Sequence, residues 1–176
     1  MGQALSFGLT QYDVEELKEH CDNRFTQAEI EGLYKRFRAL DRGRKGFISH
    51  EEFQSIPELS INPLHTRMGQ VFNHVNFKEF VHALRATSKR ASREDRLRLI
   101  FAIFDVDNDG RVSAEDLELM VRQLAGTSLS EEEVTTVVEM ALRDAGATKN
   151  GLSFEDLATA LEGAELNMDV ELPLAY

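Results

Sequence analysis

Apolar residues recur at helical spacing along most of the chain, in short segments that polar loops separate. A capping box at Thr26–Glu29 starts one such segment, in which apolar residues follow three or four positions apart up to residue 40. A shorter segment over residues 11–21 places Val14, Leu17 and Cys21 on one helix face. The pattern predicts a protein built from short amphipathic helices.

A short extended piece followed by a capped helix start occurs four times. In each copy a β-branched residue or leucine precedes a capping Ser or Asn, and an acidic residue and an apolar residue follow at fixed offsets. The copies begin at Ile48, Val75, Val112 and Leu152. In the second unit we expect Pro63 to occupy the first position of the opening helix. This repetition predicts an all-α fold of two pairs of helix–loop–helix units, bridged by short β pairings.

A polar stretch without periodicity over residues 86–92 divides the four units into two pairs. We therefore expect five regions along the chain. They are an N-terminal motif and short helix (1–25), an N-lobe with two degenerate loops (26–86), a linker (87–92), a C-lobe whose first loop is metal-competent (93–163), and a C-terminal tail (164–176).

Charge and composition exclude several classes of protein. The formal net charge is −11, and residues 89–176 contribute −10 of it through 9 basic and 19 acidic side chains, so nucleic acid is not an expected partner. We find no apolar run long enough to span a membrane and no secretory signal pattern. The single cysteine excludes an internal disulfide and favours a reducing compartment.

Residues 105–116 have the composition of a calcium-binding loop. Ca²⁺ takes six to eight oxygen ligands, which a twelve-residue loop supplies from positions 1, 3, 5, 7, 9 and 12. A glycine at position 6, Gly110, allows the sharp turn. The expected ligands are the side chains of Asp105, Asp107 and Asp109, the backbone carbonyl of Arg111, Ser113 directly or through water, and Asp116.

Position 12 of this loop departs from the usual glutamate. Asp116 is one methylene shorter, so both of its oxygens reach an ion less easily. Magnesium tolerates a single oxygen at this position. We therefore expect one Ca²⁺ site with weakened affinity and competition from Mg²⁺.

The other three loops lack the ligands for a metal ion. In the first, Gly43 and Lys45 stand at positions 3 and 5. In the second, only Asn73 and His74 separate the helix from the extended piece. In the fourth, positions 1, 3 and 5 are Ala145, Ala147 and Lys149. These units are expected to serve as folding partners of their neighbours.

With these motifs in place, the chain resembles the EF-hand superfamily and, within it, the calcineurin B family. The resemblance covers nearly all of residues 1–165 and rests on the Gly2 start, the run over residues 53–64 and the run over residues 75–80. It implies an elongated apolar groove that holds an amphipathic helix of a larger protein, such as a phosphatase catalytic subunit, a cation/proton exchanger or a protein kinase. Candidate groove residues are Met68, Phe72, Phe80, Leu84, Phe101, Met120, Leu124 and Met140.

The N-terminal sequence also fits N-myristoylation at Gly2, with Ser6 at the required offset. The resemblance strengthens this assignment, and together they predict a cytoplasmic protein with peripheral membrane association. A cluster of six basic residues over 35–45 is either a solvated helix face or a second membrane contact. The tail from Leu166 alternates apolar and acidic residues, and we hypothesise that it covers the groove when no partner is bound.

Two functional classes remain open from the sequence. The first is a regulatory subunit that holds a partner helix constitutively, and the second is a reversible calcium sensor or buffer. An enzyme is not expected, since the sequence contains neither a His-Glu-x-x-His zinc motif nor a phosphate-cradling loop. The three degenerate loops and Asp116 favour the regulatory subunit.

Overall fold

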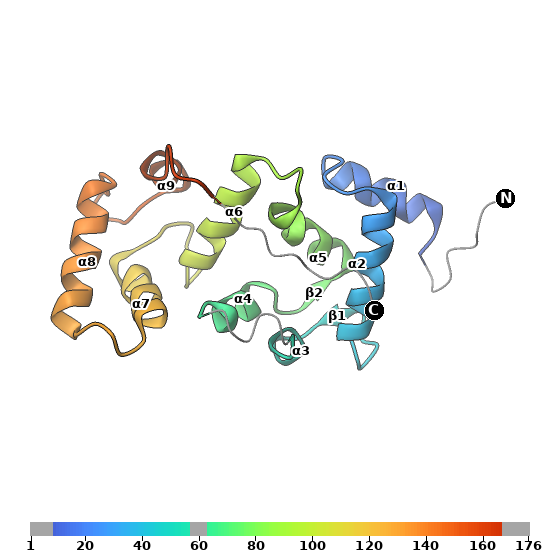
Figure 1. The fold of residues 1–176 in the computed structure, drawn as a ribbon, viewed down its shortest axis with the longest axis horizontal. Helices are drawn as coiled ribbons and strands as arrows, with labels where there is room; N and C mark the ends of the chain where they lie inside the picture. Colours follow the sequence, from blue (N-terminus) through green and yellow to red (C-terminus); the bar gives the residue numbers. More distant parts are fainter. Residues whose placement is uncertain (1–8, 57–62, 167–176) are drawn as a thin grey trace.

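The computed structural model describes residues 9–56 and 63–166, and over these residues it is predominantly helical. Figure 1 shows α6 in the middle of an elongated arrangement, between α1, α2 and α5 on one side and α7 to α9 on the other, with α4 below it. The helices are α1 (Gln11–His20), α2 (Gln27–Leu40), α3 (His50–Gln54), α4 (His65–Val71), α5 (Phe77–Ala83), the 3₁₀ helix η2 (Leu84–Thr87), α6 (Arg93–Phe104), α7 (Ala114–Ala125), α8 (Glu131–Asp144) and α9 (Phe154–Ala160). Among the described residues, no helix is long and apolar enough to cross a bilayer.

Capping boxes start most of these helices. The box at Thr26 and Glu29 is present as predicted, and the four repeat copies supply the same device at the starts of α3, α5, α7 and α9. Helix α4 differs from the prediction. It begins at His65, two residues after Pro63, and Leu64 provides no side-chain cap.

Short antiparallel pairings join the loops in two pairs. Strands β1 (Phe47–Ile48) and β2 (Val75–Asn76) pair Ile48 with Val75, and an isolated bridge pairs Val112 with Leu152. These four residues are the ones that begin the repeat copies. The predicted all-α fold with two bridged EF-hand pairs is therefore confirmed.

Helix α6 contributes to both apolar cores. The larger core gathers residues of α1 to α5 and includes Leu99 and Ile103 of α6 together with Met120 of α7. The smaller core lies among α7 to α9, with Ile100 and Phe101 of α6 packed against it. The two lobes therefore share a helix instead of meeting only at the linker.

A buried carboxylate ties the start of α6 to the N-terminal half of the chain. Asp95 is only 6% exposed, and its oxygens lie 2.8 Å from Nε of Arg85 and 3.1 Å from Nε of Arg24. Burial raises the pKa of Asp95, but the N–H and hydroxyl of Ser92 and the two guanidinium groups lower it below its usual value. Asp95 is thus held ionised between two cations.

Candidate metal centre

The candidate metal loop lies between α6 and α7, which hold its two ends. Helix α6 ends at Phe104, and Asp105 accepts the N–H groups of Asp109 and Gly110, both at 3.0 Å. Gly110 has φ +86°, a left-handed conformation that suits glycine and turns the chain sharply. The loop is therefore folded around its first carboxylate by its own backbone.

Three carboxylates converge in this loop. Asp105, Asp107 and Asp109 each offer an oxygen, and these oxygens all lie within 4.8 Å of one another. Two oxygens that bind the same Ca²⁺ at ~2.3–2.6 Å lie at most about 5 Å apart, so this spacing fits a shared calcium ion. The donor set is all oxygen, which matches a hard cation.

The charge balance of the loop favours a bound cation. Asp105 is 7% exposed, and its burial raises the pKa of its carboxyl above the usual value. The N–H groups of Gly110 and Asp109 lower the same pKa, whereas the negative charges of Asp109 and Asp116 raise it. A divalent cation would relieve both the desolvation and the mutual repulsion of these carboxylates.

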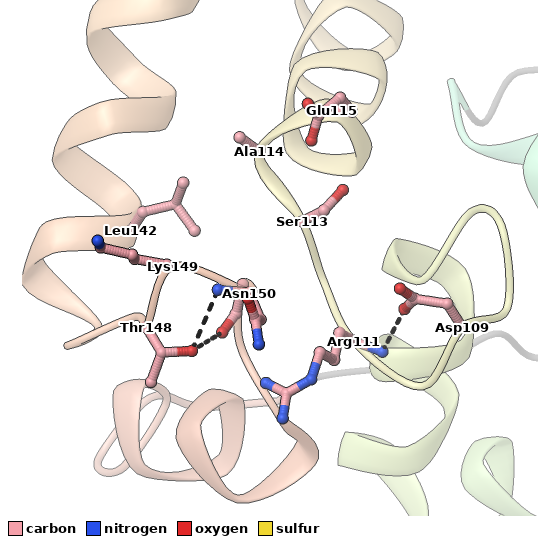
Figure 2. A pocket seen from close by; sticks show the side chains of 10 residues that line it. Asp109, Arg111, Ser113, Ala114, Glu115, Leu142, Thr148, Lys149 and Asn150 are labelled. Carbon is pink, nitrogen blue, oxygen red and sulfur yellow. Dashed lines mark hydrogen bonds between the residues drawn. The ribbon is translucent and has the colours of Figure 1, made fainter.

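Asp116, at position 12, is engaged with the start of α7. One of its oxygens accepts the N–H of Val106 at 3.1 Å, and the other accepts the N–H and hydroxyl of Ser113 at 2.8 and 2.7 Å. It does not belong to the cluster formed by the first three aspartates. Arg111 donates its backbone N–H to Asp109 at 2.8 Å, as Figure 2 shows.

The first loop keeps the backbone of a calcium loop although it lacks the ligands. Asp41 accepts the N–H groups of Lys45 and Gly46 at 2.8 and 2.7 Å, the same pattern as in the third loop. The Lys45 ammonium lies 2.9 Å from a carboxylate oxygen of Glu52, at position 12. A Cβ on Gly43 would meet the Lys45 side chain at 3.2 Å, so this side chain passes over position 3. The loop therefore carries a positive charge of its own.

The fourth loop packs directly against the third. A pocket of about 550 Å³ is lined by residues of both loops, and Figure 2 shows Thr148 and Asn150 on its fourth-loop side and Arg111 and Asp109 on its third-loop side. The second loop is short, as predicted, because only three residues connect the end of α4 to the start of β2.

The comparisons with known proteins agree with this architecture. A family model described as an EF-hand domain pair matches residues 94–162, and one described as an EF hand matches residues 33–57. The type 2 calcineurin B protein of Dictyostelium discoideum, a calcineurin subunit, is 32% identical over 170 residues, which cover 93% of this chain and 92% of that protein. The calcineurin B protein of Naegleria gruberi is 34% identical, with 92% and 94% covered, and that of Candida glabrata is 36% identical, with 86% and 90% covered.

The chain belongs to the calcineurin B family. This confirms the resemblance drawn from the Gly2 start and from the runs over residues 53–64 and 75–80. The named relatives are the B-type subunits of calcineurin, which agrees with the expectation that this family member is not an enzyme.

The family's expected groove residues fall into three groups in the structure. Four of them, Phe72, Phe80, Leu84 and Met120, are buried in the larger core. Met68 and Phe101 are half-buried, and only Leu124 and Met140 are exposed. The buried four differ from the expectation because they are packed inside the larger core, where Phe72 stacks on Phe53 of α3 and Phe80 lies beside Phe37 of α2.

Two further exposed apolar residues were missed by the sequence reasoning. Leu119 on α7 and Val137 on α8 are 52% and 42% exposed, and they accompany Leu124 and Met140 on two helices that pack together. The sequence offered one signal for these exposed residues, because α8 has more apolar positions than one buried helix face can hold. Val134 and Val138 already supply its buried side, so Val137 and Met140 must lie elsewhere. Gly2 and most of the tail lie outside the described residues.

Proposed function

We propose that this member of the calcineurin B family is a calcium-binding regulatory subunit that holds an amphipathic helix of a larger protein. The observation that carries the proposal is the exposure of four large apolar side chains on the packed helices α7 and α8, which are Leu119, Leu124, Val137 and Met140. These helices follow the one loop with a complete set of oxygen ligands. Large apolar side chains left exposed on neighbouring helices are typical of a binding surface for a partner helix.

The metal site of this proposal uses the side chains of Asp105, Asp107, Asp109, Ser113 and Asp116 and the carbonyl of Arg111. The first three aspartates already converge, which supports them as the primary ligands. A bound Ca²⁺, or a competing Mg²⁺, would offset part of the negative charge of the loop and fix the angle between α6 and α7. The hydrogen bonds of Asp116 to Ser113 and Val106 compete with coordination by its carboxylate, which supports a weakened calcium affinity.

The calcineurin catalytic subunit is the first partner to test, because the relatives are named as B-type subunits of calcineurin. A cation/proton exchanger and a protein kinase are the other candidates. Exposed glutamates at 131–133 and 139 on α8 favour a partner helix with basic flanks. Myristoylation at Gly2 would add peripheral membrane association to this cytoplasmic complex.

The proposal is tested by co-expressing the full chain with a calcineurin catalytic subunit and measuring complex formation by size-exclusion chromatography. Leu124→Glu and Met140→Glu should each abolish or strongly weaken the complex, because they place charge in the apolar contact. Thr135→Glu, at an exposed polar position of α8, is the matched control and should leave the complex intact. Equal binding by all variants would contradict the proposed surface.

The second candidate function is a reversible calcium sensor or buffer. The complete third loop is the observation in its favour, whereas the ammonium of Lys45 in the first loop opposes it. Calorimetric Ca²⁺ titration in the presence of physiological Mg²⁺ separates the two. A micromolar, calcium-selective transition that exposes apolar surface would support the sensor, and a partner complex that persists without Ca²⁺ would support the constitutive subunit.

A further inference from the structure

Arg67 connects the second helix pair of the N-lobe to the end of α6. This arginine lies on α4, is 5% exposed, and donates from Nε to the carbonyl of Ile103 at 2.8 Å. Its Nη2 donates to the carbonyl of Ala102 at 2.9 Å and to that of Asp105. Its Nη1 contacts the amide oxygen of Gln70 at 3.2 Å, within α4 itself. One side chain thus binds three carbonyls of another lobe.

These three carbonyls lie where the metal loop begins. The last carbonyls of a helix have no hydrogen-bond partner within the helix, and they carry the negative end of its dipole. A guanidinium group supplies donors to these carbonyls and a positive charge to the dipole. Burial lowers the pKa of Arg67, but the nearby carboxylates of Asp105 and Asp116 raise it. The side chain therefore stays charged beside position 1 and position 12 of the loop.

The planar guanidinium group of Arg67 constrains the positions of the carbonyls that it binds, in addition to supplying a positive charge. Arg67 holds the backbone of Asp105 in place relative to α6, and Asp105 in turn orients the loop through the N–H groups of Asp109 and Gly110. A shift of the Asp105 backbone on metal binding would act directly on its hydrogen bond from Arg67. Because α4 packs on both α3 and α6, the same movement reaches the N-lobe.

We propose that Arg67 is a positioning residue that couples metal occupancy of the third loop to the stability of α4 in the N-lobe. The inference rests on the proposed function of residues 105–116 as the calcium site. By thermodynamic reciprocity, whatever stabilises the packing of α4 also raises the metal affinity of the loop. The degenerate second hand thereby takes part in calcium binding without contributing a ligand.

A second link between the lobes offers a matched control. Arg85 binds Asp95 at the opposite end of α6, with Nε 2.8 Å from the carboxylate, and contacts none of the three carbonyls that Arg67 binds among the described residues. Both arginines join the N-terminal half of the chain to α6. Only one of them touches the metal loop.

The experiment is hydrogen exchange of the full chain with and without Ca²⁺, combined with calorimetric Ca²⁺ titration. In the wild type, Ca²⁺ should slow exchange at the amides of residues 65–71 more than at residues 27–40 of α2, which is a readout that needs no variant. In Arg67→Met and Arg67→Lys, the selective protection of α4 should disappear and the Ca²⁺ affinity should fall about tenfold. Arg85→Met should lower thermal stability and leave the affinity within about twofold of the wild-type value.

Each contrary result overturns a different statement. Failure of the wild type to bind Ca²⁺ would overturn the proposed function and this inference together. Wild-type binding without selective protection of α4 would overturn the inference alone. A gain of affinity in Arg67→Met with no change in Arg67→Lys would show that the arginine acts only as a repelling charge, which also overturns it.

Discussion

At the scale of single residues, the ammonium of Lys45 compensates negative charge in the first loop, as a bound cation would. This ammonium pairs with Glu52 and lies 4.9 Å from the centroid of the Phe47 ring. Burial raises the pKa of Glu52, but the N–H of Ser49 and the hydrogen bond and charge of Lys45 lower it to about 2. The first hand is therefore folded and charge-compensated without metal.

Replacing this lysine should destabilise the protein in a pH-dependent way. The folded-state pKa of Glu52 lies below its ordinary value of 4.5, so its contribution is present above pH 4.5 and is lost as the pH falls to about 2. Lys45→Met should lower the free energy of unfolding by about 1 kcal/mol at neutral pH, because the pair is partly exposed. Urea denaturation at several pH values measures this difference, which should shrink toward zero as the pH falls through about 2. Lys89→Met, at an exposed linker lysine, is the control and should change little.

Lengthening position 12 of the third loop should strengthen calcium binding. Asp116→Glu adds the methylene that lets both oxygens approach the ion, so the Ca²⁺ affinity should rise about tenfold with a smaller gain for Mg²⁺. Calorimetric titration with each ion measures both changes. Asp156→Glu makes the same change in the fourth loop, which lacks the ligands, and should leave affinity unaltered. Equal gains for the two ions would contradict the argument.

At the scale of elements, the fourth loop supports the third by backbone contact. Val112 and Leu152 exchange N–H and carbonyl hydrogen bonds, both at 2.9 Å, and both side chains are buried. A Cβ placed on the neighbouring Gly151 would lie 2.4 Å from the Val112 carbonyl oxygen. The close approach of the two loops therefore requires glycine at this position.

Gly151→Ala should consequently separate the two loops of the C-lobe. The clash and the left-handed φ of +81° together predict a loss of about 2–4 kcal/mol in the free energy of unfolding. Gly146→Ala is the matched control, since its φ is +68° but a Cβ there meets nothing within 4 Å, and about 1 kcal/mol is expected. Chemical denaturation measures the free energy of unfolding of both variants. Equal losses would show that the close approach of Gly151 to the Val112 carbonyl does not matter for stability.

The elements could be predicted from the sequence because their signals are local. Each capping box and the apolar residue before it lie within a few adjacent residues, so the helix starts at Ser49, Asn76, Ser113 and Ser153 could be predicted. The three converging aspartates were readable for the same reason. The start of helix α4 was predicted less accurately. It lacks a side-chain cap, and the helix begins two residues after Pro63, which was expected at its first position.

At the scale of the whole molecule, α6 packs in the cores of both lobes, so we expect the lobes to unfold as one cooperative unit. Ile103 is buried in the larger core, which otherwise consists mostly of residues from α1 to α5. Ile103→Ala should cost about 2–5 kcal/mol and speed hydrogen exchange in α2 of the N-lobe as well as in α6. Ile100→Ala, on the side of α6 that packs against the smaller core, should leave α2 protected. Equal hydrogen-exchange rates of α2 in the two variants would contradict the coupling of the two lobes through α6.

These contacts between lobes could not be predicted from sequence patterns. Arg67 lies 38 positions from Asp105, and a buried arginine that binds carbonyls has no local signature. The burial of Phe72, Phe80, Leu84 and Met120 was unpredictable for the same reason, since an apolar residue at helical spacing serves a core and a groove equally well. Only the tertiary packing of the helices decides between a core position and a groove position.

Cys21 gives the protein a natural chemical reporter. It is the sole thiol in the sequence, it follows the last residue of α1, and none of its surface is exposed. Burial raises the pKa of this thiol, although the charge of Arg85 opposes the change, so the reactive thiolate is scarce as well as hidden. Alkylation therefore requires an opening of the larger core that exposes Cys21, such as the detachment of α1. The labelling rate of the unaltered protein thus times this opening, with no engineered tag.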